Sequence, residues 1–327
     1  MSDINLAQSI ALGLVKSVLS ISGRSSKLLI LIYHRVLPTP DPFWDGDLDA
    51  NTFDWHMRVL HRYFNVLRLS EALELLRENK LPANSVCVTF DDGYADNHDV
   101  ALPILLKYSV PATFFIAVGF LNGGRMWNDT VIESVRSAPG DVLDLSNIGV
   151  GQYDISSITN RRESLYQILE RLKYLTLSER LNKANQLAKI VNVALPNDLM
   201  MTTEQLISMR DSGMEIGAHT INHPILTQVP DEEAEREIVK GREQLEELLT
   251  MPITLFAFPN GRPGKDYDER HVEMVKRVGF DYSVSTAWGA VSAKPDPFQL
   301  PRIAPWDQTA FRFALRLHQA RFSKSAG

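Results

Sequence analysis

The chain has 327 residues, of which 44% are hydrophobic and 23% charged, a composition typical of a globular protein with one large or two small cores. A formal net charge of -6 and the lack of a long basic run argue against a nucleic-acid partner, because phosphate binding needs clustered Lys and Arg. The single cysteine, Cys87, excludes an internal disulfide.

The first predicted element is an N-terminal helix within residues 1–27, where apolar residues recur at helical spacing from Leu6 to Leu19. No basic residue precedes this apolar stretch, and Gly13 and Lys16 interrupt it. It is therefore a poor signal peptide and too polar to span a bilayer. We expect a cytoplasmic protein, and the sequence leaves open whether this helix packs on the protein body or lies peripherally on the inner membrane.

From residue 28 onward, short apolar runs alternate with longer stretches of helical periodicity. The strand-like runs are residues 28–36, 65–69, 85–90, 112–118, 214–219, 253–259, 280–286 and 299–303. The helical patterns are residues 51–62, 70–79, 96–108, 203–212, 231–250 and 266–278. This alternation predicts βα units around a mostly parallel sheet, and seven or eight strands favour a barrel over an open sheet.

Residues 123–200 depart from this alternation. They follow a strand-like run but are much longer than one crossover helix, and they contain the helical sequence RRESLYQILERLKYLTLSERLNKANQLAKIV. Barrel elements flank them on both sides, so we interpret them as a helical insertion within a single barrel domain of residues 28–327.

Two adjacent carboxylates mark the end of the strand-like run 85–90. The sequence TFDDGY places Asp91 and Asp92 where a barrel strand would end, which is where barrel enzymes carry their chemistry. A bound cation would neutralise Asp92 and remove the cost of two neighbouring like charges. A simple turn, with Asp accepting backbone hydrogen bonds and Gly93 at positive φ, explains the motif about as well.

Two histidines, His219 and His223, follow the strand-like run 214–219. Their spacing brings two imidazoles together, but HxxxH alone is a weak signal, because nearby histidines are more often ordinary polar residues. In a barrel, however, this strand end and the Asp pair share one face. Two imidazoles and Asp92 would leave an open coordination position, as in catalytic zinc sites, with Asp91 free to act as a base.

The motifs YHRV, TFDDGY, HTINH and FAFPNG, in this order, resemble the polysaccharide deacetylases of carbohydrate esterase family 4, the NodB-like group. The resemblance covers about residues 28–303 and implies a distorted (β/α) barrel of seven to eight strands. It also implies a divalent metal held by Asp92, His219 and His223, with Asp91 as the catalytic base. Zinc is the expected metal, with nickel and cobalt as alternatives, since these ligands suit several first-row ions.

The family's general acid is usually a histidine in a late motif, but the late sequence QLPRI has none. In the exopolysaccharide branch, which includes deacetylases of poly-β-1,6-N-acetylglucosamine, an early strand ending in YH supplies this histidine. The sequences LIYHRV and DANTFDWHMRVL resemble that branch. The resemblance therefore implies His34 as the acid, and the alternative is a buried histidine hydrogen-bonded beside Tyr33.

Four further residues are candidates for the same site: Pro259, Asn260, Arg302 and Trp288. In FAFPNG, Pro259 fixes the turn and the backbone N–H of Asn260 is implied to donate to the oxyanion, although Tyr is the commoner residue there. Arg302 is a candidate partner that keeps Asp91 ionised, with a surface Arg as the alternative. Trp288 resembles an aromatic wall beside the acid or the sugar ring, with a core Trp as the alternative.

Together these features predict a metal-dependent hydrolase that removes acetyl groups from N-acetylhexosamine units of a polysaccharide or lipid-linked glycan. Two rival functions use the same barrel: a catalytically inactive glycan-binding protein, and an amidohydrolase acting on a small or formamido-sugar substrate. The complete set of Asp91, Asp92, His219 and His223 argues against the first rival, because a decayed site would be expected to have lost at least one of them.

Overall fold

The computed structural model describes residues 27–44, 46–292, 294–307 and 309–322. The predicted N-terminal helix and its membrane contact fall almost wholly in residues 1–26, outside the described residues. Among the helices in the described part of the chain, none combines the length and apolar character needed to cross a membrane.

Seven parallel strands form a nearly closed barrel. In spatial order they are β1 (Leu29–Tyr33), β5 (Ser85–Phe90), β6 (Ala112–Ile116), β9 (Glu215–Ala218), β10 (Leu255–Ala257), β11 (Tyr282–Trp288) and β12 (Leu300–Arg302). The N–H of Ile32 donates to Ile303 O at 3.0 Å and the N–H of Ile303 donates to Ile30 O at 2.8 Å, which joins the end of β12 to β1. These contacts confirm the predicted parallel barrel.

The predicted strand at 65–69 is much shorter than expected. Only β4 (Asn65–Val66) forms there, and it pairs with the first two residues of β5. Strand β6 pairs with the last three residues of β5, along the same edge of that strand. Together with the irregular register between β11 and β12, this makes the barrel distorted rather than regular.

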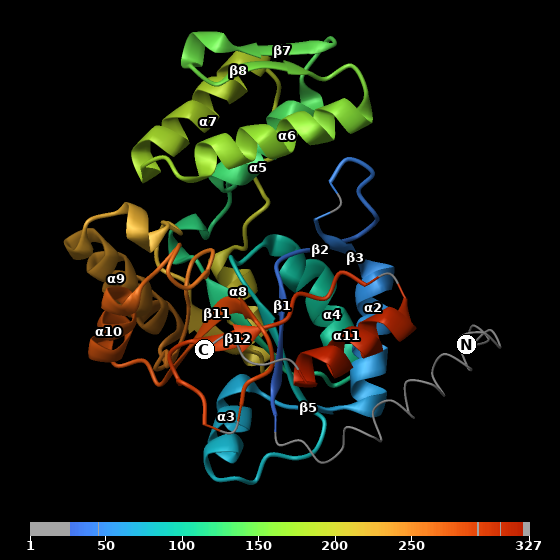
Figure 1. The fold of residues 1–327 in the computed structure, drawn as a ribbon, viewed down its shortest axis with the longest axis vertical. Helices are drawn as coiled ribbons and strands as arrows, with labels where there is room; N and C mark the ends of the chain where they lie inside the picture. Colours follow the sequence, from blue (N-terminus) through green and yellow to red (C-terminus); the bar gives the residue numbers. More distant parts are fainter. Residues whose placement is uncertain (1–26, 45, 293, 308, 323–327) are drawn as a thin grey trace, which may run out of the picture.

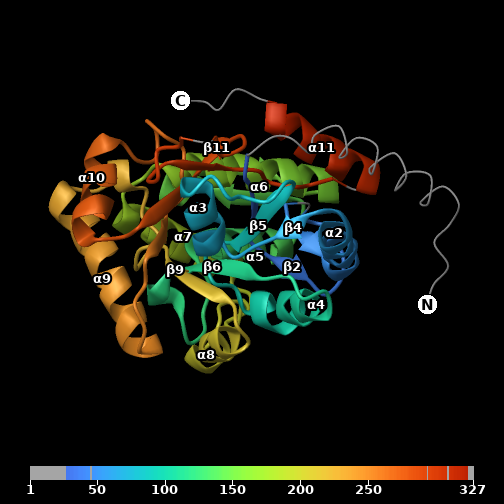
Figure 2. The ribbon, with the colours of Figure 1, turned by 90° about the horizontal axis from the view of Figure 1, so that it is seen from below.

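Helices surround the barrel (Figures 1 and 2). They are α2 (Ala50–Tyr63), α4 (Leu102–Lys107), α8 (Thr203–Asp211), α9 (Asp231–Leu249), α10 (Glu269–Val278) and α11 (Ala310–Phe322). Helix α3 (Leu69–Arg77) instead lies across the bottom of the barrel in Figure 1. Its Leu69 and Leu73 join a buried cluster with Cys87 and Phe115 from the strands. Helix α11 was not predicted from the sequence.

The barrel strands are buried on both faces, as their continuous apolar runs require. In β1, Leu29 and Leu31 belong to the cluster beneath the outer helices, whereas Leu28 before it and Ile30 belong to the cluster that α3 closes. Side chains alternate along a strand, so one apolar run supplies both cores.

Residues 127–191, between β6 and β9 in the chain, form a separate layer above the carboxyl ends of the strands (Figure 1). It contains α5 (Trp127–Ser137), the antiparallel pair β7 (Val142–Leu145) and β8 (Gly151–Asp154), α6 (Ile158–Lys173) and α7 (Leu177–Val191). These elements share their own buried apolar cluster, which includes Val135, Leu165 and Leu187. The β7–β8 hairpin was not predicted, because each strand has only four residues.

The segment after β1 connects this layer to the barrel. It includes the short parallel pair β2 (Val36–Leu37) and β3 (Leu48–Asp49). Between them, Asp41 accepts hydrogen bonds at 2.9 and 2.6 Å from Arg136 of α5, and the Trp44 ring lies 5.6 Å from the Tyr166 ring of α6. These contacts hold the layer over the strand ends.

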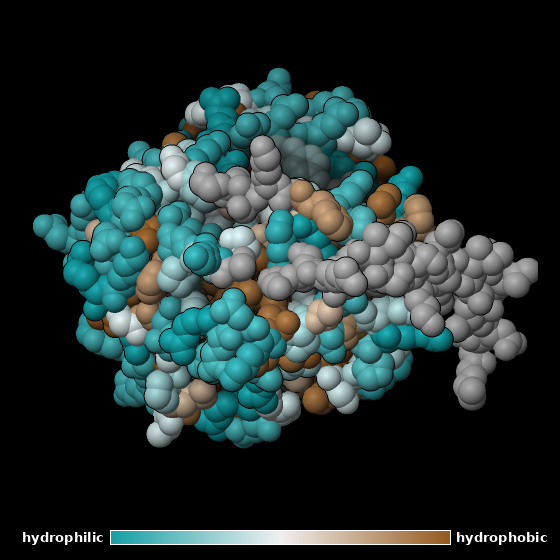
Figure 3. Space-filling view, turned by 60° about the horizontal axis from the view of Figure 1, so that its bottom comes forward, coloured by the Kyte–Doolittle hydropathy of each residue, from teal (hydrophilic) through white to brown (hydrophobic). Residues whose placement is uncertain are grey.

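The face of the molecule in Figure 3 looks toward the opposite, lower end of the barrel. Hydrophilic side chains cover most of what this view shows of the described residues, and hydrophobic ones occur in small groups. Such scattered apolar residues are normal on a protein surface. The chemistry-bearing residues lie at the other end of the strands.

Candidate active site

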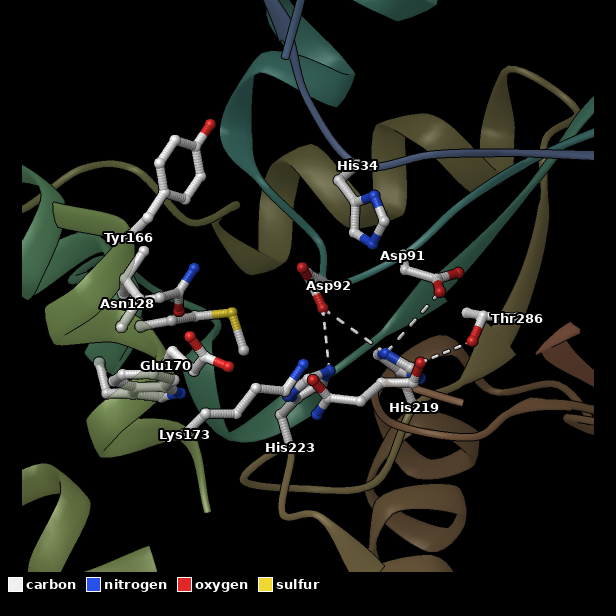
Figure 4. A pocket seen from close by; sticks show the side chains of 14 residues that line it. His34, Asp91, Asp92, Asn128, Tyr166, Glu170, Lys173, His219, His223 and Thr286 are labelled. Atoms are coloured by element: carbon white, nitrogen blue, oxygen red, sulfur yellow. Dashed lines mark hydrogen bonds and ion pairs between the residues drawn. The ribbon is translucent and has the colours of Figure 1, made fainter. Parts of the chain in front are cut away.

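A cavity of about 460 Å³ lies between the carboxyl end of the barrel and the overlying layer (Figure 4). The barrel side is lined by His34, Asp91, Asp92, His219, His223, Asn260 and Thr286. The overlying layer contributes Met126, Trp127, Asn128, Tyr166, Leu169, Glu170 and Lys173. Residues that are far apart in the sequence thus meet around one space.

The backbone fixes the two aspartates at the end of β5. The N–H of Asp91 donates to Tyr33 O at 3.0 Å, and the N–H of Ala117 donates to Asp92 O at 3.2 Å, so β1 and β6 hold the pair from both sides. Asp92 has φ +77°, a left-handed conformation that costs free energy for a residue other than Gly. Only 3% of Asp91 and 7% of Asp92 is exposed, so both carboxylates need positive partners.

Arg302 of β12 is the partner of Asp91. Its Nη1 and Nη2 donate to the two carboxylate oxygens, each at 2.7 Å, and its Nε donates to Ser285 O at 2.9 Å. Arg302 is 1% exposed, so it is not the surface arginine considered as the alternative. Burial raises the pKa of Asp91, but Arg302 and His219 outweigh this and hold that pKa below its usual value. Asp91 is therefore ionised and able to accept a proton.

Helix α9 holds the loop that carries both histidines. The buried Glu237 carboxylate accepts hydrogen bonds from the backbone N–H groups of Ile221 and Asn222, at 2.9 and 2.8 Å. A Cβ on Gly241 would lie only 2.8 Å from the carbonyl carbon of Thr220, so the helix can approach the loop this closely only with Gly at that position.

The two histidines converge on Asp92. Its Oδ1 lies 3.5 Å from His219 Nε2 and 3.3 Å from His223 Nε2, and the three possible ligand atoms all lie within 4.8 Å of one another. His219 Nδ1 is 2.7 Å from Ala257 O, to which it donates, so that in the neutral imidazole Nε2 carries the lone pair facing Asp92. The Oδ1 atom is buried and has no hydrogen-bond partner among the described residues.

This donor set fits a small divalent cation. Ligand atoms that each lie about 2.0–2.2 Å from a tetrahedral ion are roughly 3.3–3.6 Å from one another. The distances from Asp92 Oδ1 to His219 Nε2 and to His223 Nε2 match this spacing. Burial lowers the pKa of His223 to about 3, so its imidazole is neutral, as a ligand must be. Burial also lowers the pKa of His219, but the neighbouring carboxylates of Asp91 and Asp92 outweigh this effect and raise that pKa above its usual value. The two carboxylates therefore favour a positive charge between them and the histidines.

His34 follows β1 at the rim of the same cavity. Its side chain is exposed and points toward the two aspartates in Figure 4. The buried histidine beside Tyr33 is instead His56, whose Nδ1 lies 3.2 Å from the Tyr33 hydroxyl. The alternative of a buried His34 is therefore wrong, and its ring is accessible to a ligand in the cavity.

Asn260 and Trp288 line two neighbouring cavities that both reach His34. Pro259 is buried, while Asn260 lines the cavity and its carbonyl accepts a hydrogen bond from Thr286 Oγ1 at 2.8 Å. The Asn260 N–H has no acceptor among the described residues. Trp288 is 45% exposed, so it is not a core Trp, and it lines an adjacent hollow of about 390 Å³ that also reaches His34 and Thr286.

Sequence reasoning missed the side of the cavity formed by α5 and α6. Asn128, Tyr166, Glu170 and Lys173 carry no local motif, and they reach the cavity only because the layer folds back over the strand ends. The helical spacing of Tyr166, Glu170 and Lys173 places them on one helix face. This spacing was the only sequence feature that could have pointed to these residues. Every amphipathic helix has the same spacing, so it could not identify them as part of a site.

Comparison with known sequences gives consistent matches. The family model described as polysaccharide deacetylase matches residues 78–139 and 158–283, which is more than half of the chain. YxkH of Bacillus subtilis, named as a polysaccharide deacetylase, is 23% identical over 285 residues, covering 86% of this chain and 72% of that protein. The poly-β-1,6-N-acetyl-D-glucosamine N-deacetylase of Staphylococcus aureus is 27% identical over 154 residues, covering 46% of this chain and 53% of that enzyme, so the match spans about half of each.

Solved structures share the fold. The Streptococcus pyogenes deacetylase PplD in complex with acetate matches with a TM-score of 0.60 and 21% identity, covering 91% of this chain and 99% of the other. IcaB from Ammonifex degensii matches with a TM-score of 0.57 and 20% identity, covering 91% of this chain and 97% of the other. At these identities the likeness concerns the fold alone.

Proposed function

This chain belongs to the polysaccharide deacetylase family, a family of enzymes, and from that premise we propose that it removes acetyl groups from N-acetylhexosamine units of a glycan by metal-dependent hydrolysis. The observation that carries the proposal is the convergence of His219 Nε2 and His223 Nε2 on the unpartnered Asp92 Oδ1, beside a separate ionised carboxylate, Asp91. Three ligands and an independent base are what metal-assisted amide hydrolysis requires.

In this proposal Asp92, His219 and His223 hold the metal. When bound, a divalent cation supplies Lewis-acid activation of water and stabilises negative charge developing on the acetyl oxygen. Zinc is our first candidate, with nickel and cobalt as alternatives, because carboxylate and imidazole ligands suit all three ions.

The other residues handle protons and orientation. Asp91 accepts the proton of the attacking water, and Arg302 keeps its carboxylate ionised and fixed in direction. The N–H of Asn260 donates to the oxyanion, and His34 donates a proton to the departing amine. Trp288 packs against a sugar ring beyond His34, where an exposed aromatic face is available.

For the substrate, we propose an exopolysaccharide or its lipid-linked precursor. The Staphylococcus aureus relatives are named for poly-β-1,6-N-acetyl-D-glucosamine, so oligomers of that glycan are the first to test. The cavity and the adjacent hollow both reach His34, which supports a substrate longer than one sugar.

The test is acetate release from β-1,6-linked N-acetylglucosamine oligomers by the purified protein. We expect release that a chelator abolishes and zinc or cobalt restores, and that Asp91→Asn lowers by about 100-fold or more, since a general base contributes roughly that factor. A protein that binds a metal tightly but releases no acetate from any N-acetylated glycan would contradict the proposed substrate class. Absence of both metal binding and release would favour a glycan-binding protein instead.

A further inference from the structure

The cavity contains a lysine that the proposed reaction does not use. Lys173, the last residue of α6, extends into the cavity near His223 (Figure 4). It is half-buried, and its Nζ forms no ion pair or hydrogen bond with any residue in the described part of the chain. A partly desolvated ammonium without an anion is unfavourable, so its position calls for a partner that the chain does not provide.

Other cations gather behind Lys173. The Tyr174 ring lies 5.9 Å from Lys173 Nζ, 4.8 Å from Lys265 Nζ and 6.0 Å from the Arg262 guanidinium carbon. One carboxylate, Asp266, lies among them, and it already accepts hydrogen bonds from Arg262 Nε at 3.0 Å and from the Arg262 backbone N–H at 3.1 Å. The cations therefore outnumber the carboxylate.

A buried arginine adds to this positive charge. Arg180 of α7 is 2% exposed, and its guanidinium donates to backbone carbonyls rather than to a carboxylate: to Lys173 O at 3.3 Å and to His223 O at 3.5 Å. Burial lowers the pKa of Lys173, and Arg262, Lys265 and Arg180 lower it further, with Asp266 opposing them. The lysine thus faces the cavity with like charges behind it.

We propose that Lys173 binds an anionic substituent of the glycan, a carboxylate or a phosphate, so that the enzyme is selective for an acidic glycan. The inference rests on the proposed function. A lysine ammonium is a compact charge that pairs with either anion. The metal ligands and Lys173 line one cavity, so the anionic group lies on the sugar that carries the acetamido group or on its neighbour.

Glu170 sets a limit on where the anion binds. It lies one helical turn before Lys173 and lines the same cavity, yet it forms no ion pair with Lys173. An anion beside Glu170 would be repelled, whereas sugar hydroxyl groups can donate to it. The anionic group of the substrate therefore lies beside Lys173, and uncharged hydroxyl groups lie beside Glu170.

The test compares acetate release by the metal-loaded enzyme from three oligomers of equal length. One is a neutral N-acetylglucosamine oligomer, the second alternates N-acetylglucosamine with glucuronic acid, and the third is the neutral oligomer bearing phosphate monoesters. We expect kcat/KM to be at least about 10-fold higher for one of the charged oligomers, as a charge-assisted contact allows. The preference should weaken as salt rises, and the favoured oligomer shows whether carboxylate or phosphate is recognised.

Two variants make the test specific. Lys173→Gln should remove the preference, mainly by raising KM for the charged oligomer, because the lost contact is to the anion. Lys189→Gln removes the same charge from an exposed position on α7 and should leave the preference intact. Equal rates on all three oligomers, or an equal loss on all three in Lys173→Gln, would overturn the inference.

Direct binding separates this inference from the proposed function. The tryptophan fluorescence of the protein, with Trp127 in the cavity wall, can report binding of the same oligomers without turnover. Tighter binding of a charged oligomer that Lys173→Gln abolishes would support the anion site even with no acetate released, in which case only the proposed reaction fails. Equal binding of charged and neutral oligomers would overturn the anion site whatever the activity.

Discussion

The two adjacent carboxylates of the site, Asp91 and Asp92, have partners of different kinds. Asp91 receives two hydrogen bonds from Arg302, a permanent cation, whereas Asp92 faces two imidazoles that can be neutral ligands. Burial raises the pKa of Asp92, but His223 and His219 lower it below the usual value. In the proposed reaction the two side chains therefore have different tasks: Asp91 serves as the base and Asp92 as a metal ligand.

Two substitutions of Arg302 should distinguish the effect of its charge on Asp91 from the effect of its two hydrogen bonds to Asp91. Arg302→Met removes the cation that lowers the pKa of Asp91, so that pKa rises. Because the base must be ionised, the acidic limb of the pH profile of kcat/KM should move to higher pH. Arg302→Lys keeps the charge but not the paired donors, so the limb should stay in place while kcat falls about 10- to 100-fold. Acetate release across pH measures both effects.

Folding has to be checked in both Arg302 variants, because breaking a buried ion pair costs about 3–5 kcal/mol. Thermal unfolding identifies a variant that is too unstable to interpret. An unchanged acidic limb in a folded Arg302→Met protein would show that another group limits the rate at low pH.

Among the secondary structure elements, α6 and α7 connect the overlying layer to the loop that carries His219 and His223. The connection is Arg180, which reaches from α7 to the carbonyl groups of Lys173 and His223 and lies with its guanidinium carbon 4.9 Å from the Trp127 ring centre. A guanidinium buried without a carboxylate costs free energy, and burial lowers its pKa to about 10. Its hydrogen bonds to Lys173 O and His223 O assign it the role of holding the His223 loop.

Arg180→Met should therefore weaken metal binding. Methionine keeps much of the side-chain volume but cannot donate to His223 O, so the ligand loop loses an outer contact, which typically costs about 10- to 100-fold in metal affinity. Zinc competition against a chromogenic chelator measures the change. Arg161→Met is the matched control, because Arg161 also donates to backbone carbonyls, including Val135 O at 2.8 Å, but on a part of the layer that does not line the cavity. Equal effects of the two substitutions would contradict the role of Arg180.

At the scale of the whole molecule, the barrel could be predicted because each strand is a continuous apolar run and each site motif follows one. TFDDGY and HTINH mark two strand ends, so Asp92 and both histidines could be expected to meet. The cavity wall opposite them could not be predicted. It depends on how the layer of residues 127–191 folds back over the barrel, and contacts such as that of Arg136 with Asp41 are long-range and leave no local pattern.

Metal removal should lower the stability of the entire fold, because the proposed ligands come from two strand ends that are not neighbours: Asp92 follows β5 and the histidines follow β9, with β6 between them. A cation bound only by the folded state stabilises it by about 2.7 kcal/mol at 100 times its Kd. For a chain of this size that corresponds to about 4 °C in Tm. Chelation should lower the wild-type Tm by this amount and zinc should restore it, whereas the Tm of Asp92→Asn should not respond to metal.

Asp211→Asn is the control, because Asp211 is exposed, and its Tm should respond to metal as the wild-type Tm does. A wild-type Tm that is the same with chelator and with zinc would contradict the metal site.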